Sequence, residues 1–176
     1  YNMDQVFTIQ HYLNDYQQKW PVSGVMSVIR QGKVIIQESC GMASHEHRIA
    51  NSPNTVFSLA SVSKQFTAFS IMQLSDPGKI DLYTPVNHYL PDCYQVDKRI
   101  TIHHLLSHTS GLPQICTFDN DFFIGDDRKL YDPQYLYDTY LNIPQNDMPG
   151  TRYEYKNIGY TLLAWVIEYI SGLSMD

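Results

Sequence analysis

The stretch "FSLASVSKQFTAFSIMQL", residues 57–74, combines an apolar helical pattern with two polar side chains that can do chemistry. Its apolar residues recur at helical spacing, which predicts a helix over 59–74 that ends at Pro77-Gly78. Residues three apart on a helix share a face, so we expect Ser61 and Lys64 to touch. A serine becomes nucleophilic when a neighbouring base removes its proton, and a neutral lysine can be that base.

A lysine base requires burial, because burial lowers its pKa from about 10.4 towards 7. Phe57, Leu59, Phe66 and Phe69 surround the pair in the sequence and are expected to line a desolvated crevice. The pair alone carries little information, since 14 Ser and 7 Lys give about 0.6 such spacings by chance. For an isolated pair, a serine that caps the helix or faces solvent beside a surface lysine is the favoured explanation.

A tyrosine two residues before an asparagine is the second pattern, because a phenol can pass protons while an amide positions a substrate. The third copy is expected in a loop between Pro149-Gly150 and a helix predicted over 161–171. Loops held by rigid helices are where catalytic side chains are presented. The other two copies fall in predicted helices. The three copies are Tyr12/Asn14, Tyr140/Asn142 and Tyr155/Asn157.

The bulk composition is that of one globular core with no nucleic-acid signature. The chain has 176 residues and a net charge of −6 without a dense basic run, which argues against nucleic acid as a partner. The longest apolar run, 158–170, is too short to span a bilayer and contains Glu168. Cys40, Cys93 and Cys116 form no Cys-x-x-Cys motif, so neither a disulfide framework nor a zinc knuckle is indicated.

Most of the remaining chain is predicted to be helix and loop. A helix over 4–20 ends at Pro21, and β-rich runs on either side of Gln31-Gly32 predict a hairpin. The segment 41–56 is expected to be irregular. Because two strands make a marginal sheet, either the domain is nearly all-helical with a hairpin appended, or further strands belong to chain outside these residues. Further predictions are a helix over 102–108 capped by Thr101 and closed by Gly111 and Pro113, a surface loop over 114–132, and a helix over 133–142 opened by Asp132.

The histidines suggest a metal site as an alternative. His104 and His108 are four residues apart on a predicted helix, and His45-Glu46-His47 lies upstream. The segment between the first two lacks the glutamate that the His-Glu-x-x-His motif uses as a base. A core or capping role is the favoured explanation for this pair.

Three segments in order resemble a known family: "FSLASVSKQFTA", "ITIHHLLSHTSGLP" and "PGTRYEYKNIGYTLLAWVIEYISG". They are similar to the signatures of the serine β-lactamase and penicillin-binding superfamily, most closely its class C β-lactamase, D-alanyl-D-alanine peptidase and esterase branch. The resemblance implies an α/β (more narrowly α+β) fold. In that fold an N-terminal hairpin belongs to an antiparallel sheet beside a helical region.

The resemblance also implies roles for four residues. Ser61 matches the acylated nucleophile, Lys64 the adjacent base or proton relay, and Tyr155 the phenol that activates the serine or protonates the leaving group. Asn157 matches the amide that binds the substrate's carbonyl. Which group takes the first proton is left open. The backbone N–H of Ser61 would form half of an oxyanion hole, and no metal or organic cofactor is implied.

Two departures from the family pattern stand out. The late Lys/His-Thr/Ser-Gly motif is absent, because the similar "HTSG" at 108–111 precedes Tyr155. We therefore expect residues 1–176 to be the N-terminal part of a single catalytic domain, with helix and hairpin over 4–40 and mainly helix over 57–176. Lys156 replaces a residue that is often small in relatives. We expect it to point to solvent, since lysine is rarely buried; the alternative is that its charge lowers the pKa of the neighbouring phenol.

The expected function is acyl transfer through Ser61 to water, with a β-lactam, a D-Ala-D-Ala peptide of the peptidoglycan type or a small ester as substrate. The chain alone is expected to be weakly active or inactive without the remaining C-terminal part of the domain. A non-catalytic penicillin-binding or sensor protein of the same fold is the alternative. Family analogy favours a periplasmic or extracellular location, although the polar N-terminus lacks a signal-peptide layout.

Overall fold

The computed structural model describes residues 3–20, 22–113, 135, 137–141, 145 and 147–175. The chain divides into two compact units, Tyr1–Ser58 and Leu59–Asp176, each described by itself. Within the described ranges, no helix is both long and apolar enough to cross a membrane. Pro21, Cys116 and the predicted loop over 114–132 lie outside the described residues, and Cys40 and Cys93 carry free thiols.

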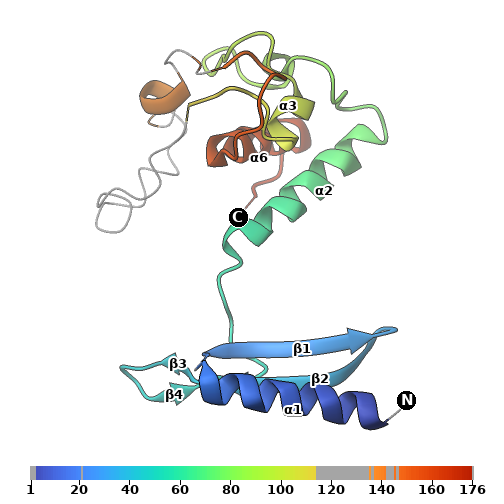
Figure 1. Ribbon diagram of the computed structural model, residues 1–176. Coiled ribbons are helices and arrows are strands. Elements are labelled where there is room, and N and C mark those ends of the chain that lie inside the picture. Colours follow the sequence, from blue (N-terminus) through green and yellow to red (C-terminus); the bar gives the residue numbers. More distant parts are fainter. Residues whose placement is uncertain are drawn as a thin grey trace. The chain divides into compact units, whose positions relative to one another are not determined.

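The first unit contains the predicted helix and hairpin. Helix α1 (Met3–Lys19) lies along the antiparallel pair of β1 (Gly24–Arg30) and β2 (Lys33–Cys40) (Figure 1). Gln31 and Gly32 form the turn with φ of 50° and 74°, the left-handed conformation that a two-residue turn matched to strand twist requires. The predictions of this helix and of the hairpin are confirmed.

The prediction that 41–56 is wholly irregular is wrong. Strand β3 (Met42–Ser44) pairs with β4 (Ile49–Ala50) in a second small antiparallel sheet. The Asn51 amide donates to the Ser23 hydroxyl at 3.0 Å and to the Cys40 carbonyl at 2.8 Å, which ties the end of this sheet to both hairpin strands. Strands of two or three residues are too short to show alternation in a sequence, so this sheet left no periodic signal.

The second unit is a helical core. The 3-10 turn η1 (Ala60–Val62) leads into α2 (Ser63–Ser75), so the helix predicted over 59–74 is confirmed with a tighter first turn. Helix α3 (Ile102–Leu106) begins at the predicted cap Thr101, but ends before the predicted 108. Helix α6 (Asn157–Ser171) begins earlier than predicted and ends at Gly172, whose φ is 72°.

Two short helical turns complete this unit. They are η2 (Val86–Tyr89) and the π-helical turn η4 (Tyr137–Leu141). The second falls within the helix predicted over 133–142, of which the structure describes only residues 135 and 137–141.

Apolar side chains from α2, η2, α3 and α6 form one core. Burying each Leu or Ile side chain contributes about 1.5–3 kcal/mol, so the apolar face of α6 is a main source of stability. Figure 1 shows α6 beside α3 and α2, and α6 contacts both of them. The side chains that are fully buried here include Ile71, Ile80, Val86, Ile100, Ile102, Leu105, Leu112, Ile158, Leu162, Leu163 and Val166.

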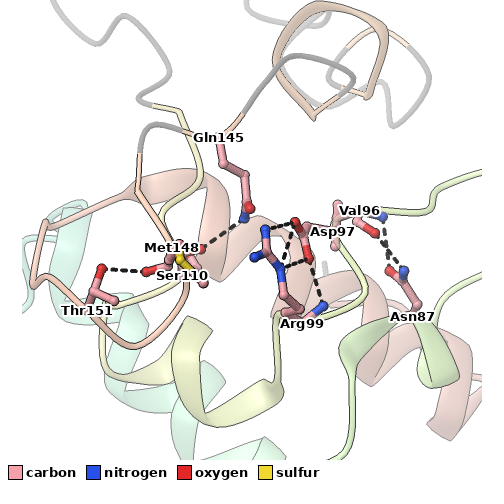
Figure 2. A network of polar contacts seen from close by, with 8 residues as sticks. All are labelled: Asn87, Val96, Asp97, Arg99, Ser110, Gln145, Met148 and Thr151. Atoms are coloured by element: carbon pink, nitrogen blue, oxygen red, sulfur yellow. Dashed lines mark hydrogen bonds and ion pairs between the residues drawn. The ribbon is translucent and has the colours of Figure 1, made fainter.

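Side-chain hydrogen bonds fix the loops around this core (Figure 2). The Asn87 amide donates to the Val96 carbonyl at 2.7 Å and accepts from the Val96 N–H at 3.0 Å. It thereby reproduces a two-bond backbone pair. The Gln145 amide donates to the Ser110 carbonyl at 3.1 Å, which joins residues far apart in the chain. These bonds hold the loop that follows η2 and join the segment after α3 to Gln145.

Candidate active site

Ser61 and Lys64 lie at the junction of η1 and α2. The Lys64 ammonium donates to the Ser61 hydroxyl, with Nζ and Oγ 3.3 Å apart. Ser61 is exposed and Lys64 is half-buried. Ala60, directly before the serine, has φ of 44°, a left-handed conformation that a residue with a Cβ rarely adopts. Backbone strain of this kind is concentrated at functional sites.

Tyr155 and Asn157 reach the same place from the start of α6. The Tyr155 phenol donates to Ser61 Oγ at 2.7 Å, and Lys64 Nζ donates to Asn157 Oδ1 at 2.8 Å. Lys64 Nζ also lies 4.8 Å from the centre of the Tyr155 ring. All four predicted site residues are thus within one hydrogen-bonded group.

The start of α6 decides how the third Tyr-x-Asn copy is presented. The helix begins at Asn157 rather than at the predicted Thr161, so the amide is on its first turn while Tyr155 lies in the preceding extended segment. Of the other copies, Tyr12 and Asn14 are on α1 in the first unit, and the second copy is only partly described.

The charge of Lys64 acts on the phenol. Its ammonium, and then the Ser61 hydroxyl, lower the pKa of Tyr155, while partial burial acts in the opposite direction. A cation favours the phenolate because the negative charge is then compensated. Tyr155 is therefore more acidic than Tyr160, because burial raises the pKa of Tyr160.

Within the second unit, the predicted apolar crevice is not formed by the side chains assigned to it. Leu59, Phe66 and Phe69 are 52%, 57% and 63% exposed, and Phe57 belongs to the first unit. On a helix of 3.6 residues per turn, Lys64 shares a face with the buried positions of α2, whereas Phe66 and Phe69 lie on the opposite face. The buried positions of α2 are Thr67 and Ile71. The partial burial of Lys64 comes from the face that packs on the core.

The expectation that Lys156 points to solvent is wrong. Its side chain is 3% exposed, and its ammonium forms an ion pair with Glu154 at 2.5 Å. Residues two apart in an extended segment point to the same side, so Glu154 and Lys156 meet on the side opposite to Tyr155. Its charge is thus neutralised by the carboxylate, and it does not contribute to the lowered pKa of the phenol.

His104 and His108 serve different structural purposes. His104 Nδ1 accepts from the Thr101 N–H at 3.2 Å and closes the helix cap, which confirms the capping explanation for this residue. His108 lies beyond the end of α3, with its ring 4.6 Å from that of Tyr155. In the part of the chain that the structure describes, no group of three or more His, Cys, Asp or Glu side chains is arranged to hold a metal ion.

The "HTSG" segment supports the Tyr155 segment through the backbone. The N–H of Glu154 donates to the His108 carbonyl at 2.9 Å, and the N–H of Gly150 donates to the Thr109 carbonyl at 2.8 Å. Gly111 has φ of 71° and lies so close to the segment at Asp147 that a Cβ would stand 2.0 Å from the Asp147 carbonyl oxygen. Sequence reasoning assigned this segment only to a helix end. Its Gly111 was the signal for a close backbone approach.

Comparisons with known proteins agree with this geometry. "Penicillin-binding protein 4*" of Bacillus subtilis (strain 168) is 34% identical over 161 residues, 89% of this chain and 34% of the relative. The crystal structure of a penicillin binding protein from Bacillus halodurans superposes with a TM-score of 0.71 at 32% identity, covering 92% of this chain and 51% of that one.

EstCE1, described as a hydrolase with promiscuous acyltransferase activity, superposes with a TM-score of 0.75 at 25% identity, covering 98% of this chain and 49% of that one. The chain thus spans about a third of the length of the curated relative and about half of each solved chain. Residues 9–176 match the family described as Beta-lactamase. With that match, and with mixed helices and antiparallel strands similar to those of penicillin-binding proteins, the chain belongs to the beta-lactamase family.

Proposed function

We propose that Ser61 is the nucleophile of a serine hydrolase and carries an acyl group during turnover. The observation that carries the proposal is the position of its hydroxyl oxygen, 2.7 Å from the Tyr155 phenol and 3.3 Å from the Lys64 ammonium. A serine becomes a nucleophile when a neighbouring group takes its proton, and the same group can later return one. Asn157, bound to the ammonium, has its remaining amide hydrogens to offer to a substrate carbonyl.

The proposed steps balance within these residues. Ser61 Oγ bonds to the substrate's carbonyl carbon and its proton passes to Tyr155 or Lys64. The leaving nitrogen or oxygen collects that proton as its bond to the carbonyl carbon breaks. Water then bonds to the acyl carbon and gives up a proton. The bond from that carbon to Ser61 Oγ breaks, and Ser61 Oγ takes the proton.

Tyr155 is our candidate for the first proton acceptor. Its oxygen is nearer to Ser61 Oγ than Lys64 Nζ is, and its pKa is lowered by the Lys64 ammonium. In this arrangement the phenolate takes the proton, and Lys64 stabilises the negative charge. Lys64 as a neutral base is the second arrangement that the same distances allow.

The proposed substrate class is a β-lactam, a D-Ala-D-Ala peptide or a small ester. A relative named as a penicillin-binding protein supports the first two, and a structural neighbour named as a hydrolase with acyltransferase activity supports acyl transfer in general. We further propose that both units belong to one catalytic domain. Because relatives are longer, we expect the 176-residue chain alone to react slowly.

The test is intact-protein mass spectrometry of the full-length gene product with a fluorescent penicillin, alongside hydrolysis of a p-nitrophenyl ester. We expect an adduct that Ser61→Ala abolishes and that the neighbouring Ser63→Ala preserves. Ser63 is a suitable control because it is exposed, at the first position of α2. An equal adduct on Ser61→Ala would contradict the proposal.

The lifetime of the adduct separates the two classes of protein. Return to the unmodified mass within minutes indicates a hydrolase. An adduct that persists for hours, with no ester turnover, indicates a penicillin-binding or sensor protein.

A further inference from the structure

His108 is enclosed by three phenol rings. Its imidazole lies 4.6 Å from the Tyr155 ring and 5.1 Å from the Tyr160 ring, with planes inclined by 35° and 30°. The Tyr153 ring stands edge-on at 6.0 Å. Aromatic rings at such separations attract one another beyond the effect of burying their area. The imidazole therefore forms one wall of the space that the Tyr155 ring occupies.

The same histidine binds the backbone on both sides of Tyr155. Its carbonyl accepts from the N–H of Glu154 at 2.9 Å, and its Nδ1 accepts from the N–H of Lys156 at 3.2 Å. Those residues directly precede and follow Tyr155. Ring and backbone of Tyr155 are thus both held by one residue that does not itself touch Ser61.

The backbone of His108 is strained in this position. Its φ of 57° is in the left-handed region, which asparagine and histidine enter more readily than most residues with a Cβ. Strain of this kind persists only where surrounding contacts compensate for it. Two strained residues, Ala60 and His108, thus lie next to Ser61 and Tyr155 respectively.

We propose that His108 is a positioning residue that holds the Tyr155 phenol on Ser61, and that it does so only as a neutral imidazole. The inference rests on the proposed function and names a regulation of that same site. A proton on Nδ1 removes the acceptor for the Lys156 N–H. It also places a second positive charge near Lys64.

The surroundings favour the neutral ring. Burial and then the Lys64 charge lower the pKa of His108. As pH falls through this lowered pKa the ring becomes protonated, so Tyr155 is released and acylation slows. The ionisable side chains at or acting on the ring are Lys64 on α2, Tyr160 on α6, and Tyr153 and Tyr155 in the segment before α6. Glu154 and Lys156 bind His108 through their backbone N–H groups, and their side chains neutralise each other.

The kinetic test compares wild type, His108→Asn and His108→Phe in the full-length gene product. Asparagine tolerates the left-handed backbone and offers an acceptor oxygen but does not titrate. Phenylalanine keeps a ring and loses the acceptor. Exposed His88 provides the control His88→Asn. Each protein is checked for an unchanged thermal midpoint before kinetics.

We expect wild-type acylation to fall at least about tenfold across an acid limb that His108→Asn lacks and His88→Asn retains. His108→Phe is expected to lower kcat by about 10–100-fold at neutral pH with KM unchanged within about twofold. An acid limb in His108→Asn with the wild-type midpoint would overturn the inference.

A readout independent of activity separates this inference from the proposed function. Nitrogen NMR of the histidines should show His108 with an unprotonated Nδ1 at neutral pH. The Lys156 amide signal should shift with the same midpoint as His108. If Ser61→Ala reacts like wild type, the proposed function fails while this titration still decides the role of His108. A Lys156 amide signal whose position does not change as His108 titrates would overturn that role.

Discussion

The Tyr155 phenol meets the Ser61 hydroxyl at 2.7 Å although 94 positions separate them in the chain. Local structure places Lys64 beside Ser61, but only the packing of α6 against α2 brings Tyr155 there. Buried Ile71 on α2 and Leu162 on α6 belong to one core, so this reactive group depends on the stability of that core. Mutations that loosen the core should therefore reduce acylation before they unfold the unit.

Tyr155→Phe tests the phenol oxygen without removing the ring. Because the ring can still stack on His108 at 4.6 Å, the fold should be preserved while the hydrogen bond to Ser61 is lost. Proton transfer by a positioned group contributes about 10²–10⁴-fold, so we expect kcat/KM for an ester to fall about 10²–10³-fold. Stopped-flow acylation by a fluorescent penicillin measures the same step.

The matched control is Tyr169→Phe, on helix α6, which follows the Tyr155 segment. Tyr169 is 60% exposed, and its hydroxyl removal should leave kcat/KM within about twofold. Equal losses in both variants would mean that the phenol of Tyr155 has no special part in acylation.

Lys156→Met tests whether the buried charge stabilises the fold. Lys156→Met removes only the buried member of the pair. Glu154 is 43% exposed, so no buried unpaired charge remains and the desolvation cost of the ammonium disappears. We therefore expect the free energy of unfolding to change by less than about 1 kcal/mol in Lys156→Met and to fall by about 2–4 kcal/mol in Lys156→Ala, which leaves a cavity. Urea unfolding followed by circular dichroism measures both values.

The same pair predicts a pH dependence. The hydrogen bond from Lys156 lowers the pKa of Glu154 below its ordinary value of 4.5. A lowered carboxyl pKa means that the folded state releases the Glu154 proton more readily than the unfolded state does. The stabilisation by the Glu154–Lys156 pair is therefore complete above pH 4.5 and is lost as pH falls through the lowered pKa. The loss of unfolding free energy on acidification should be smaller in Lys156→Met than in the wild type. Acid unfolding curves of the two proteins that superpose would show that the pair does not contribute to stability.

Sequence reasoning was most successful where the determinants are local. The Ser61–Lys64 contact follows from helical geometry alone, and the Thr101 cap follows from the short polar side chain before an apolar run. The Gln31-Gly32 hairpin likewise follows from turn chemistry. Each of these needs only a few consecutive residues.

Features that depend on distant neighbours were missed. Nothing beside Lys156 in the sequence shows that its side chain is buried. Its ion-pair partner Glu154 is only two positions away, but the burial depends on distant residues. The two-faced character of α2 was also missed, because both faces are apolar and periodicity cannot tell which one packs. His108 gave only a helix-end signal, since its three phenol neighbours come from the segment and helix about 50 residues later.

Asn87→Ala should destabilise the second unit through the loop that ends at Val96. The amide makes both a donor and an acceptor bond to that backbone, at 2.7 and 3.0 Å. Each neutral hydrogen bond contributes about 0.5–1.5 kcal/mol, so we expect a loss of about 1–3 kcal/mol. Asn87→Asp keeps the acceptor but places a carboxylate oxygen against the Val96 carbonyl oxygen, so it should lose at least as much as alanine in thermal unfolding at neutral pH. An unchanged thermal midpoint in both variants would contradict this account.

Gly111→Ala separates a conformational requirement from a steric one when it is compared with Gly78→Ala. Both glycines have positive φ, 71° and 79°, so alanine costs about 1–2 kcal/mol at either position. A Cβ at Gly78 meets nothing within 4 Å, whereas one at Gly111 would stand 2.0 Å from the Asp147 carbonyl oxygen. That backbone must move, which we expect to cost at least about 2 kcal/mol more in urea unfolding.

The displacement should also reach the active site. Asp147 precedes the segment that presents Tyr155. The N–H of Gly150 donates to the Thr109 carbonyl, so this segment is hydrogen-bonded to the 108–111 segment. Gly111→Ala should therefore slow acylation by about tenfold or more under conditions where the protein remains folded, while Gly78→Ala leaves the rate unchanged. Equal unfolding energies and equal acylation rates in the two variants would show that the 108–111 segment does not set the position of the phenol.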